Sequence, residues 1–117
     1  MVYYANYLKF LEEARTEFLE ARGLSVKELA RQHILFVVAR QEIDYKLPAF
    51  YGDILQIHTR IVKTSGVKVE FEYEIKNQEN KFVSTAKTLM VCVDKELKPK
   101  AIPEKVRQSM QRAEELI

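Results

Sequence analysis

Apolar residues near the start of the chain recur at helical spacing. Between Met1 and Gly23 they fall at intervals of i, i+3, i+4 and i+7, and they are Tyr7, Phe10, Leu11, Ala14, Phe18 and Ala21. Mostly charged residues occupy the opposite side, and Gly23 followed by Leu24 suits a left-handed helix stop. The pattern predicts a long amphipathic helix whose apolar face is buried.

A shorter helix should follow the first one. Ser25 and Glu28 have the spacing of a capping box, in which each side chain can accept a backbone amide proton. The predicted helix runs to about Gln32. Its apolar residues would hold the end of the first helix in place, and they are Val26, Leu29 and Ala30.

Period-two alternation between residues 35 and 94 predicts four long strands. Their expected bounds are 35–46, 54–63, 67–76 and 81–94. The third strand alternates most regularly, so one of its faces should contact water. In the first strand, alternation places Leu35, Val37, Ala39, Ile43 and Tyr45 on one face and Arg40, Glu42 and Asp44 on the other. Because Phe36 and Val38 add apolar groups to that second face, both faces of its first half should be covered.

The last strand and the chain end complete the predicted arrangement. Residues 89–93 are apolar on both faces, which requires a helix on one side and favours a second subunit on the other. Pro103 suits the start of a closing helix with the apolar stripe Val106, Met110, Ala113 and Ile117. A long helix followed by antiparallel strands is an α+β pattern. We therefore predict a hotdog fold, a curved sheet wrapped around the first helix, with residues 1–117 as one domain.

Composition excludes several functional classes. The chain has 117 residues, 47% of them hydrophobic, and its net charge of +2 is too small to favour nucleic-acid binding. It has neither an apolar run long enough to cross a bilayer nor a secretion signal, so we expect a cytoplasmic protein. The single cysteine, Cys92, is interpreted as a small buried hydrophobe rather than a catalytic thiol, with only His33 and His58 as potential partners. We expect neither a metal ion nor a cofactor.

An ordered set of segments resembles one enzyme family across almost the whole chain. These segments are Val2–Leu8, Glu13–Glu17, Phe36–Val38, Glu42–Tyr45, Pro48–Ala49, Gly52–Leu55, Leu89–Asp94 and Lys98–Pro103. They are similar to the hotdog acyl-CoA thioesterases of the 4-hydroxybenzoyl-CoA thioesterase family. Within it, the likeness is closest to the bacterial subgroup associated with the Tol-Pal envelope system.

The resemblance implies hydrolysis of an acyl-CoA thioester to a free acid and CoA. In such enzymes an aspartate in the loop before the first helix acts as nucleophile or general base, and backbone amides at the helix N-terminus bind the thioester carbonyl. Free amides and the helix dipole would stabilise a developing oxyanion there. The backbone amide of Tyr4 occupies that position in this chain.

The chain departs from the family pattern at this point. The family aspartate would fall a few residues before Val2, and the first strand of the fold would precede it. Three explanations remain open: a misassigned or trimmed start, a natural inactive variant, or a substitute carboxylate. The candidate substitutes are Glu12, Glu13, Glu17, Asp44 and Asp53. For Glu13 and Glu17 the favoured interpretation is a solvated helix face, and for Asp53 it is a turn. Asp44 could pair with a cation across the sheet.

Substrate-binding residues follow from the shape and charge of CoA. Its phosphates need cations near a groove at a subunit boundary, and the candidates are Lys63, Ser65, Lys68, Lys98 and Lys100. Surface lysines placed for solubility are the alternative. Tyr3, Tyr4 and Tyr7 could line an acyl tunnel or pack the helix on the sheet. Asn6 is predicted to cap the first helix, with a substrate role as the second interpretation.

Other functions and assemblies stay open. A hotdog protein that binds acyl-CoA or an acyl carrier protein without hydrolysis is the main alternative. A hydratase would need a histidine with an acidic partner, which the expected positions of His33 and His58 do not favour. Because unpaired strand edges require cover, we expect a homodimer joined edge to edge, with its active sites at the seam, and pairing of two dimers is compatible with the pattern.

Overall fold

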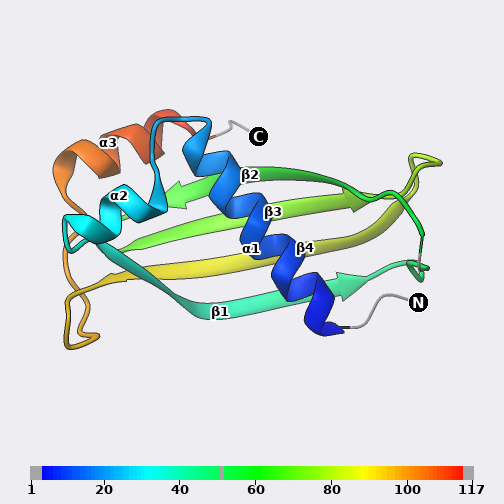
Figure 1. Ribbon diagram of the computed structural model, residues 1–117, viewed down its shortest axis with the longest axis horizontal. Helices are drawn as coiled ribbons and strands as arrows, with labels where there is room; N and C mark the ends of the chain where they lie inside the picture. The colour runs from blue at the N-terminus through cyan, green and yellow to red at the C-terminus, as the bar shows by residue number, and fades with distance from the viewer. Residues whose placement is uncertain (1–3, 51, 115–117) are drawn as a thin grey trace.

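The first helix, α1, spans Tyr4–Glu20 and lies across one face of a sheet (Figure 1). The computed structural model describes residues 4–50 and 52–114, with side chains from Tyr7 onward. The buried apolar side chains in the described part of α1 are Tyr7, Leu11, Phe18 and Leu19. Gly23 has a φ of 77°, and the Leu24 amide donates to the Leu19 carbonyl at 2.8 Å, as in a glycine-terminated helix. The predicted stop is confirmed, whereas Ala21 is exposed because α1 has already ended.

The second helix, α2, spans Val26–Arg31, close to its predicted length. Ser25 Oγ accepts the Glu28 amide at 3.4 Å, but the Glu28 carboxylate bonds Arg31 instead of the Ser25 amide. Half of the predicted capping box is therefore formed. Leu29 is buried, while Val26 and Ala30 are exposed, so a single apolar side chain anchors this helix.

The four predicted strands form one antiparallel sheet. Their bounds are Leu35–Tyr45 for β1, Gln56–Thr64 for β2, Lys68–Lys76 for β3 and Phe82–Val93 for β4. The spatial order is β1-β4-β3-β2, so β1 and β2 are the edge strands of the described sheet. Figure 1 shows α1 crossing the sheet diagonally, with its N-terminal end over β1 and its C-terminal end toward β2.

A bulge in β1 corrects the predicted faces of this strand. Leu35 pairs with Val93 and Tyr45 with Ser84, but the register shifts between Val38 and Arg40. The inserted residue exchanges the two faces of β1, so strict alternation fails there. In the single chain, Val37 and Val38 are 38% and 48% exposed, so the first half of β1 is not covered on both sides as predicted.

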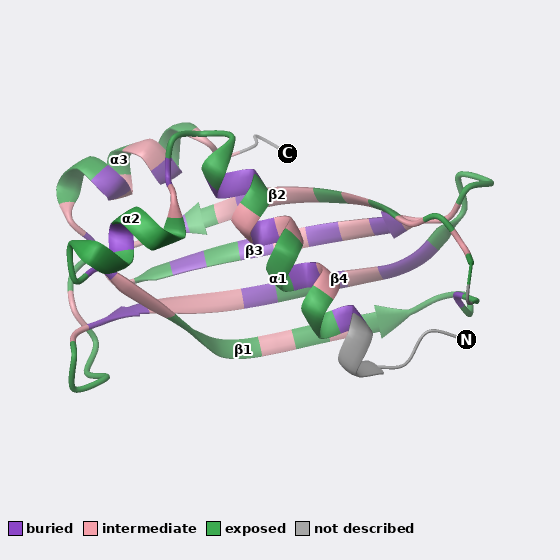
Figure 2. Cartoon of the chain, viewed as in Figure 1, coloured by how far each residue is buried: buried purple, intermediate pink, exposed green. Residues whose placement is uncertain are grey.

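The core lies between α1 and the sheet. On β3 the buried side chains alternate with wetter ones, as predicted, and they are Val69, Phe71, Tyr73 and Ile75. Purple segments in Figure 2 mark this buried row on the central strands. The rings of Phe18 and Phe71 pack edge to face, with 6.2 Å between their centroids. Burial of the apolar stripe of α1 on this row fixes the position of the helix on the sheet.

The closing helix, α3, spans Glu104–Arg112 and follows Pro103, which occupies the N-cap position. Val106 and Met110 are buried and Ala113 packs against the core, which confirms the predicted stripe as far as it is described. Ile117 lies outside the described residues. The Glu114 carboxylate accepts the Thr64 amide at 2.8 Å, so a hydrogen bond joins the residues just after α3 to the end of β2.

Candidate active site

The N-terminal end of α1 is the candidate oxyanion site. The first amides of any α-helix lack partners within the helix. The first turn of α1 carries no acidic side chain to neutralise them. Because α1 begins at Tyr4, Asn6 lies within the first turn and is not the N-cap, which corrects that prediction. Tyr3 falls outside the described residues, and side chains at positions 4–6 are not described.

Tyr7 joins α1 to the end of β1. Its ring packs edge to face on Tyr45, with 5.1 Å between ring centroids. The Tyr7 hydroxyl and the Ser84 hydroxyl are both buried, and neither has a partner of good hydrogen-bond geometry among the described residues. Burial raises the pKa of Tyr7, the nearby Ser84 hydroxyl partly opposes that rise, and the Asp53 charge adds to it. Tyr7 therefore packs the helix on the sheet, one of its two predicted roles.

Asp53 orders the loop that faces this end of α1. One carboxylate oxygen accepts the Phe50 amide at 2.8 Å, and the other accepts from the Gln78 side chain at 3.1 Å. These two hydrogen bonds lower the pKa of Asp53 below its usual value. The contacts agree with the predicted turn role. A carboxylate stabilised in its charged form is a poor general base.

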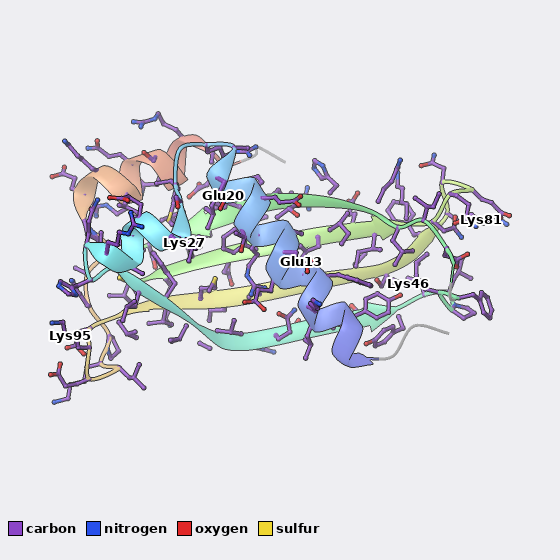
Figure 3. All side chains as sticks on the ribbon, viewed as in Figure 1. Glu13, Glu20, Lys27, Lys46, Lys81 and Lys95 are labelled. Carbon is purple, nitrogen blue, oxygen red and sulfur yellow. The ribbon has the colours of Figure 1, made fainter. Side chains whose placement is uncertain are left out.

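The other candidate carboxylates have exposed side chains. Figure 3 labels Glu13 midway along α1. Glu13 and Glu17 line an open groove of about 520 Å³ between α1 and the edge strand β2, together with Phe10, Phe18, Leu55 and Ile57. Asp44 lies directly opposite Thr85, so its cross-strand neighbour is not the predicted cation. Their surroundings fit the solvated interpretation of these side chains.

The side of α1 that faces the sheet carries a buried cation that the sequence patterns did not predict. Arg15 is 8% exposed, and its Nη1 donates to Tyr73 Oη at 3.2 Å and to Thr88 Oγ1 at 3.4 Å. Thr88 in turn donates to Gln41 Oε1 at 2.7 Å. The signal was present, since Arg15 is four residues from both Leu11 and Leu19 and hence shares their buried face.

Arg15 borders a mostly apolar cavity of about 180 Å³ between α1, α2 and the sheet. The other lining residues include Glu12, Leu19, Leu29, Phe36, Phe71 and Met90. Glu12 is the one acidic residue among those that line it in the described part of the chain, and its side chain is exposed. The cavity adjoins the same side of α1 as β1, the edge strand that carries exposed apolar residues.

The predicted phosphate-binding residues converge at the opposite end of the sheet. The Ile102 amide donates to the Gly66 carbonyl, and the Lys100 amide donates to the Cys92 carbonyl. The segment with Lys98 and Lys100 therefore runs beside the turn that carries Lys63, Ser65 and Lys68. The Lys100 ammonium also donates to the His33 carbonyl at 3.2 Å. This cluster and the N-terminus of α1 lie at different ends of one chain.

Cys92 and the two histidines behave as the sequence indicated. Cys92 is fully buried, and burial raises the pKa of its thiol, with Lys100 partly opposing that rise. His58 is exposed on β2 opposite Glu74, and His33 lies exposed in the connector before β1. No group of three His, Cys, Asp or Glu within residues 4–50 and 52–114 is arranged to hold a metal ion. Over the same ranges, no helix has the length and apolar character of a membrane span.

Comparison with known proteins identifies the family. The acyl-CoA thioester hydrolase YbgC of Escherichia coli O6:H1 is 37% identical over 107 residues, which are 91% of this chain and 80% of that protein. The probable thioesterase of Bartonella henselae superposes with a TM-score of 0.80 at 35% identity, covering 87% and 85% of the two chains. A DHNA-CoA thioesterase from Staphylococcus aureus, at 23% identity, has the same fold with a TM-score of 0.89 and coverage of 95% and 77%. Residues 1–110 match the Thioesterase-like superfamily, and the chain belongs to that hotdog family.

Proposed function

We propose that the protein is a cytoplasmic acyl-CoA thioesterase that hydrolyses a CoA thioester to a free acid and CoA. The match of residues 1–110 to the Thioesterase-like superfamily is the observation that carries this proposal. The likeness to YbgC supports a place in the Tol-Pal-associated subgroup that the sequence resembles. Acyl carrier protein is an alternative donor of the acyl group.

The thioester carbonyl would bind at the N-terminal end of α1. Water attack on a thioester develops negative charge on the carbonyl oxygen, and preorganised amides stabilise that charge. The free amides of the first turn, with that of Tyr4 foremost, supply the donors, and no acidic side chain in that turn competes for them. In the family an aspartate ahead of this helix activates the water, whereas Asp53, held in its charged form, contributes to its own loop.

A dimer joined through β1 would complete the site. Ser84 lies beside Tyr7 near one end of β4, and the Cys92 carbonyl accepts from the Lys100 amide near the other end. The helix N-terminus and the lysine cluster (Lys63, Ser65, Lys68, Lys98 and Lys100) of one chain are therefore separated by eight residues of β4, roughly 27 Å. Antiparallel pairing of two β1 strands would rotate the partner by a half turn. Its lysine cluster would then approach the helix N-terminus of the first protomer, where CoA phosphates require cations.

Exposure along β1 supports this assembly. Val37 and Val38 are exposed in the single chain, and an uncovered apolar edge strand favours pairing. Sedimentation velocity at micromolar concentration should show a species of twice the 13.7 kDa chain mass or a larger multiple. A monodisperse monomer would refute the proposed assembly.

The activity test follows thiol release from a panel of acyl-CoA and acyl-carrier-protein thioesters. Because Cys92 is buried, the folded protein should contribute little background to a thiol reagent. Absence of release from every ester would overturn the enzymatic proposal. Binding of acyl-CoA without release would instead support the non-hydrolytic binding protein.

A proline variant tests the backbone amide directly. Tyr4→Pro removes the amide proton at the first helical residue, a position that tolerates proline. Tyr4→Ala is the matched control, since it also removes the side chain but keeps the amide. The proline variant should be about 100-fold to 1,000-fold slower in kcat than the alanine variant. Equal rates would exclude this amide from the oxyanion site.

A further inference from the structure

Arg15 has more hydrogen-bonding capacity than its surroundings satisfy. A guanidinium group carries five N–H donors on three nitrogens. Among the described residues, Nη1 alone has acceptors, the hydroxyls of Tyr73 and Thr88, and no carboxylate forms an ion pair with Arg15. Arg15 is only 8% exposed as a residue, so water reaches the remaining donors only in part. Burial of an unpaired charge is costly unless an anion completes the site.

This cation, paired with two hydroxyls and with no carboxylate among the described residues, borders a cavity that can hold part of an acyl group. The cavity of about 180 Å³ is lined by apolar side chains from α1, α2 and three strands, including Leu19, Phe36 and Met90. An apolar cavity of roughly 150 Å³ is large enough for a benzene ring. The distal carbons of an acyl chain would therefore fit beside Arg15. Glu12, the acidic residue at this cavity, is exposed, so water screens its repulsion of a second anion.

One face of α1 connects the proposed thioester site to this cavity. Positions 4, 8, 12, 15 and 19 fall within one stripe at a helical period of 3.6 residues. Leu8, which is 37% exposed, provides an apolar surface between the two regions. Eleven residues separate Tyr4 from Arg15, which corresponds to about 16 Å along the helix axis. Because helical side chains lean toward the N-terminus, the guanidinium lies nearer to the thioester than that distance.

We infer that Arg15 binds a carboxylate at the far end of the acyl group, which makes medium-length dicarboxylic acyl-CoA thioesters favoured substrates. This inference rests on the proposed thioesterase function and specifies its substrate class. The free nitrogens of the guanidinium would donate to the distal carboxylate while Nη1 keeps its contacts with Tyr73 and Thr88. A methyl-terminated chain of the same length would leave the cation unpaired.

The kinetic test compares decanedioyl-CoA with decanoyl-CoA. The wild-type protein should prefer the carboxylate-terminated ester, and Arg15→Met should lower kcat/KM for that ester by about 10-fold to 100-fold relative to decanoyl-CoA. Arg15→Gln, which keeps a polar donor near Tyr73 but removes the charge, serves as a second variant if the methionine variant is unfolded. Arg31→Met is the control, because Arg31 is an exposed α2 residue outside the cavity and should leave the ratio unchanged.

A binding measurement separates this inference from the hydrolysis proposal. Isothermal titration calorimetry with free decanedioate and free decanoate requires no catalysis. Tighter binding of decanedioate, lost in both Arg15 variants and kept in Arg31→Met, would support the inference even if no ester is hydrolysed. Equal binding of the two acids by the wild-type protein, or an unchanged preference in Arg15→Met and Arg15→Gln, would overturn it.

Discussion

Truncation of Leu11 should weaken the packing of α1 on the sheet by a measurable free energy. Leu11 has no exposed surface and lies in the core cluster. Leu11→Ala removes three carbon atoms, a loss of about 2.4 kcal/mol at ~0.8 kcal/mol per buried methylene. The cavity left behind adds to this loss, so we expect a total of about 3–4 kcal/mol. A domain of this size has a stability of roughly 5–15 kcal/mol, so the variant should remain folded but be much weaker.

Urea unfolding followed by circular dichroism measures this loss. The unfolding midpoint should fall while the slope with denaturant stays unchanged, and the melting temperature should fall by about 10–15 °C. Leu8→Ala is the matched control on the same helix, and because Leu8 is partly exposed its cost should stay near 1 kcal/mol. Equal losses for the two variants would refute the assignment of Leu11 to the interface between helix and sheet.

Three further predictions concern backbone and charge. Gly23→Ala should lower the free energy of unfolding by about 1 kcal/mol, because Gly23 has a φ of 77°. Gly66→Ala is the control in the same urea titration and should be near neutral, because Gly66 has open space around it and no positive φ. The lowered pKa of Asp53 stabilises the fold above the ordinary value of 3.8, so stability should fall as pH drops through this region. Asp53→Asn should flatten that acid decline, and an unchanged profile would contradict the loop role. Burial raises the pKa of Cys92 above 9.0, so the unfolded thiol ionises first and stability should decline above that pH. The urea midpoint should fall less between pH 8 and pH 9.5 in Cys92→Ala than in the wild-type protein. An equal fall in the two proteins would argue against thiol burial.

Local patterns predicted every helix and strand of the described chain. Alternation from Val69 to Ile75 places large apolar groups on one face, and burial of that face follows from the period of a strand. Gly23 stops α1 because its positive φ is accessible to glycine without strain. The family resemblance reached further than these patterns and supplied the thioesterase expectation, which the match of residues 1–110 confirms at the family level.

Features that depend on contacts across the fold were not predictable from period alone. The bulge in β1 is a shift in its register with β4, and it exchanges the faces that strict alternation assigned. The two segments that carry the lysines lie side by side because the Ile102 amide donates to the Gly66 carbonyl, an interaction between positions far apart in sequence.

Arg15 shows most plainly what tertiary structure decides. Its position on the apolar face of the helix predicts burial, but its charge favours contact with water. The sequence alone does not show which of these two effects is larger. The hydroxyls of Tyr73 and Thr88, presented by two different strands, satisfy one nitrogen and allow the cation to stay inside. Outside the bulged strand β1, sequence determined which faces are apolar, because side-chain period is a local property. Tertiary structure decided which polar groups could be buried, because their partners come from distant strands.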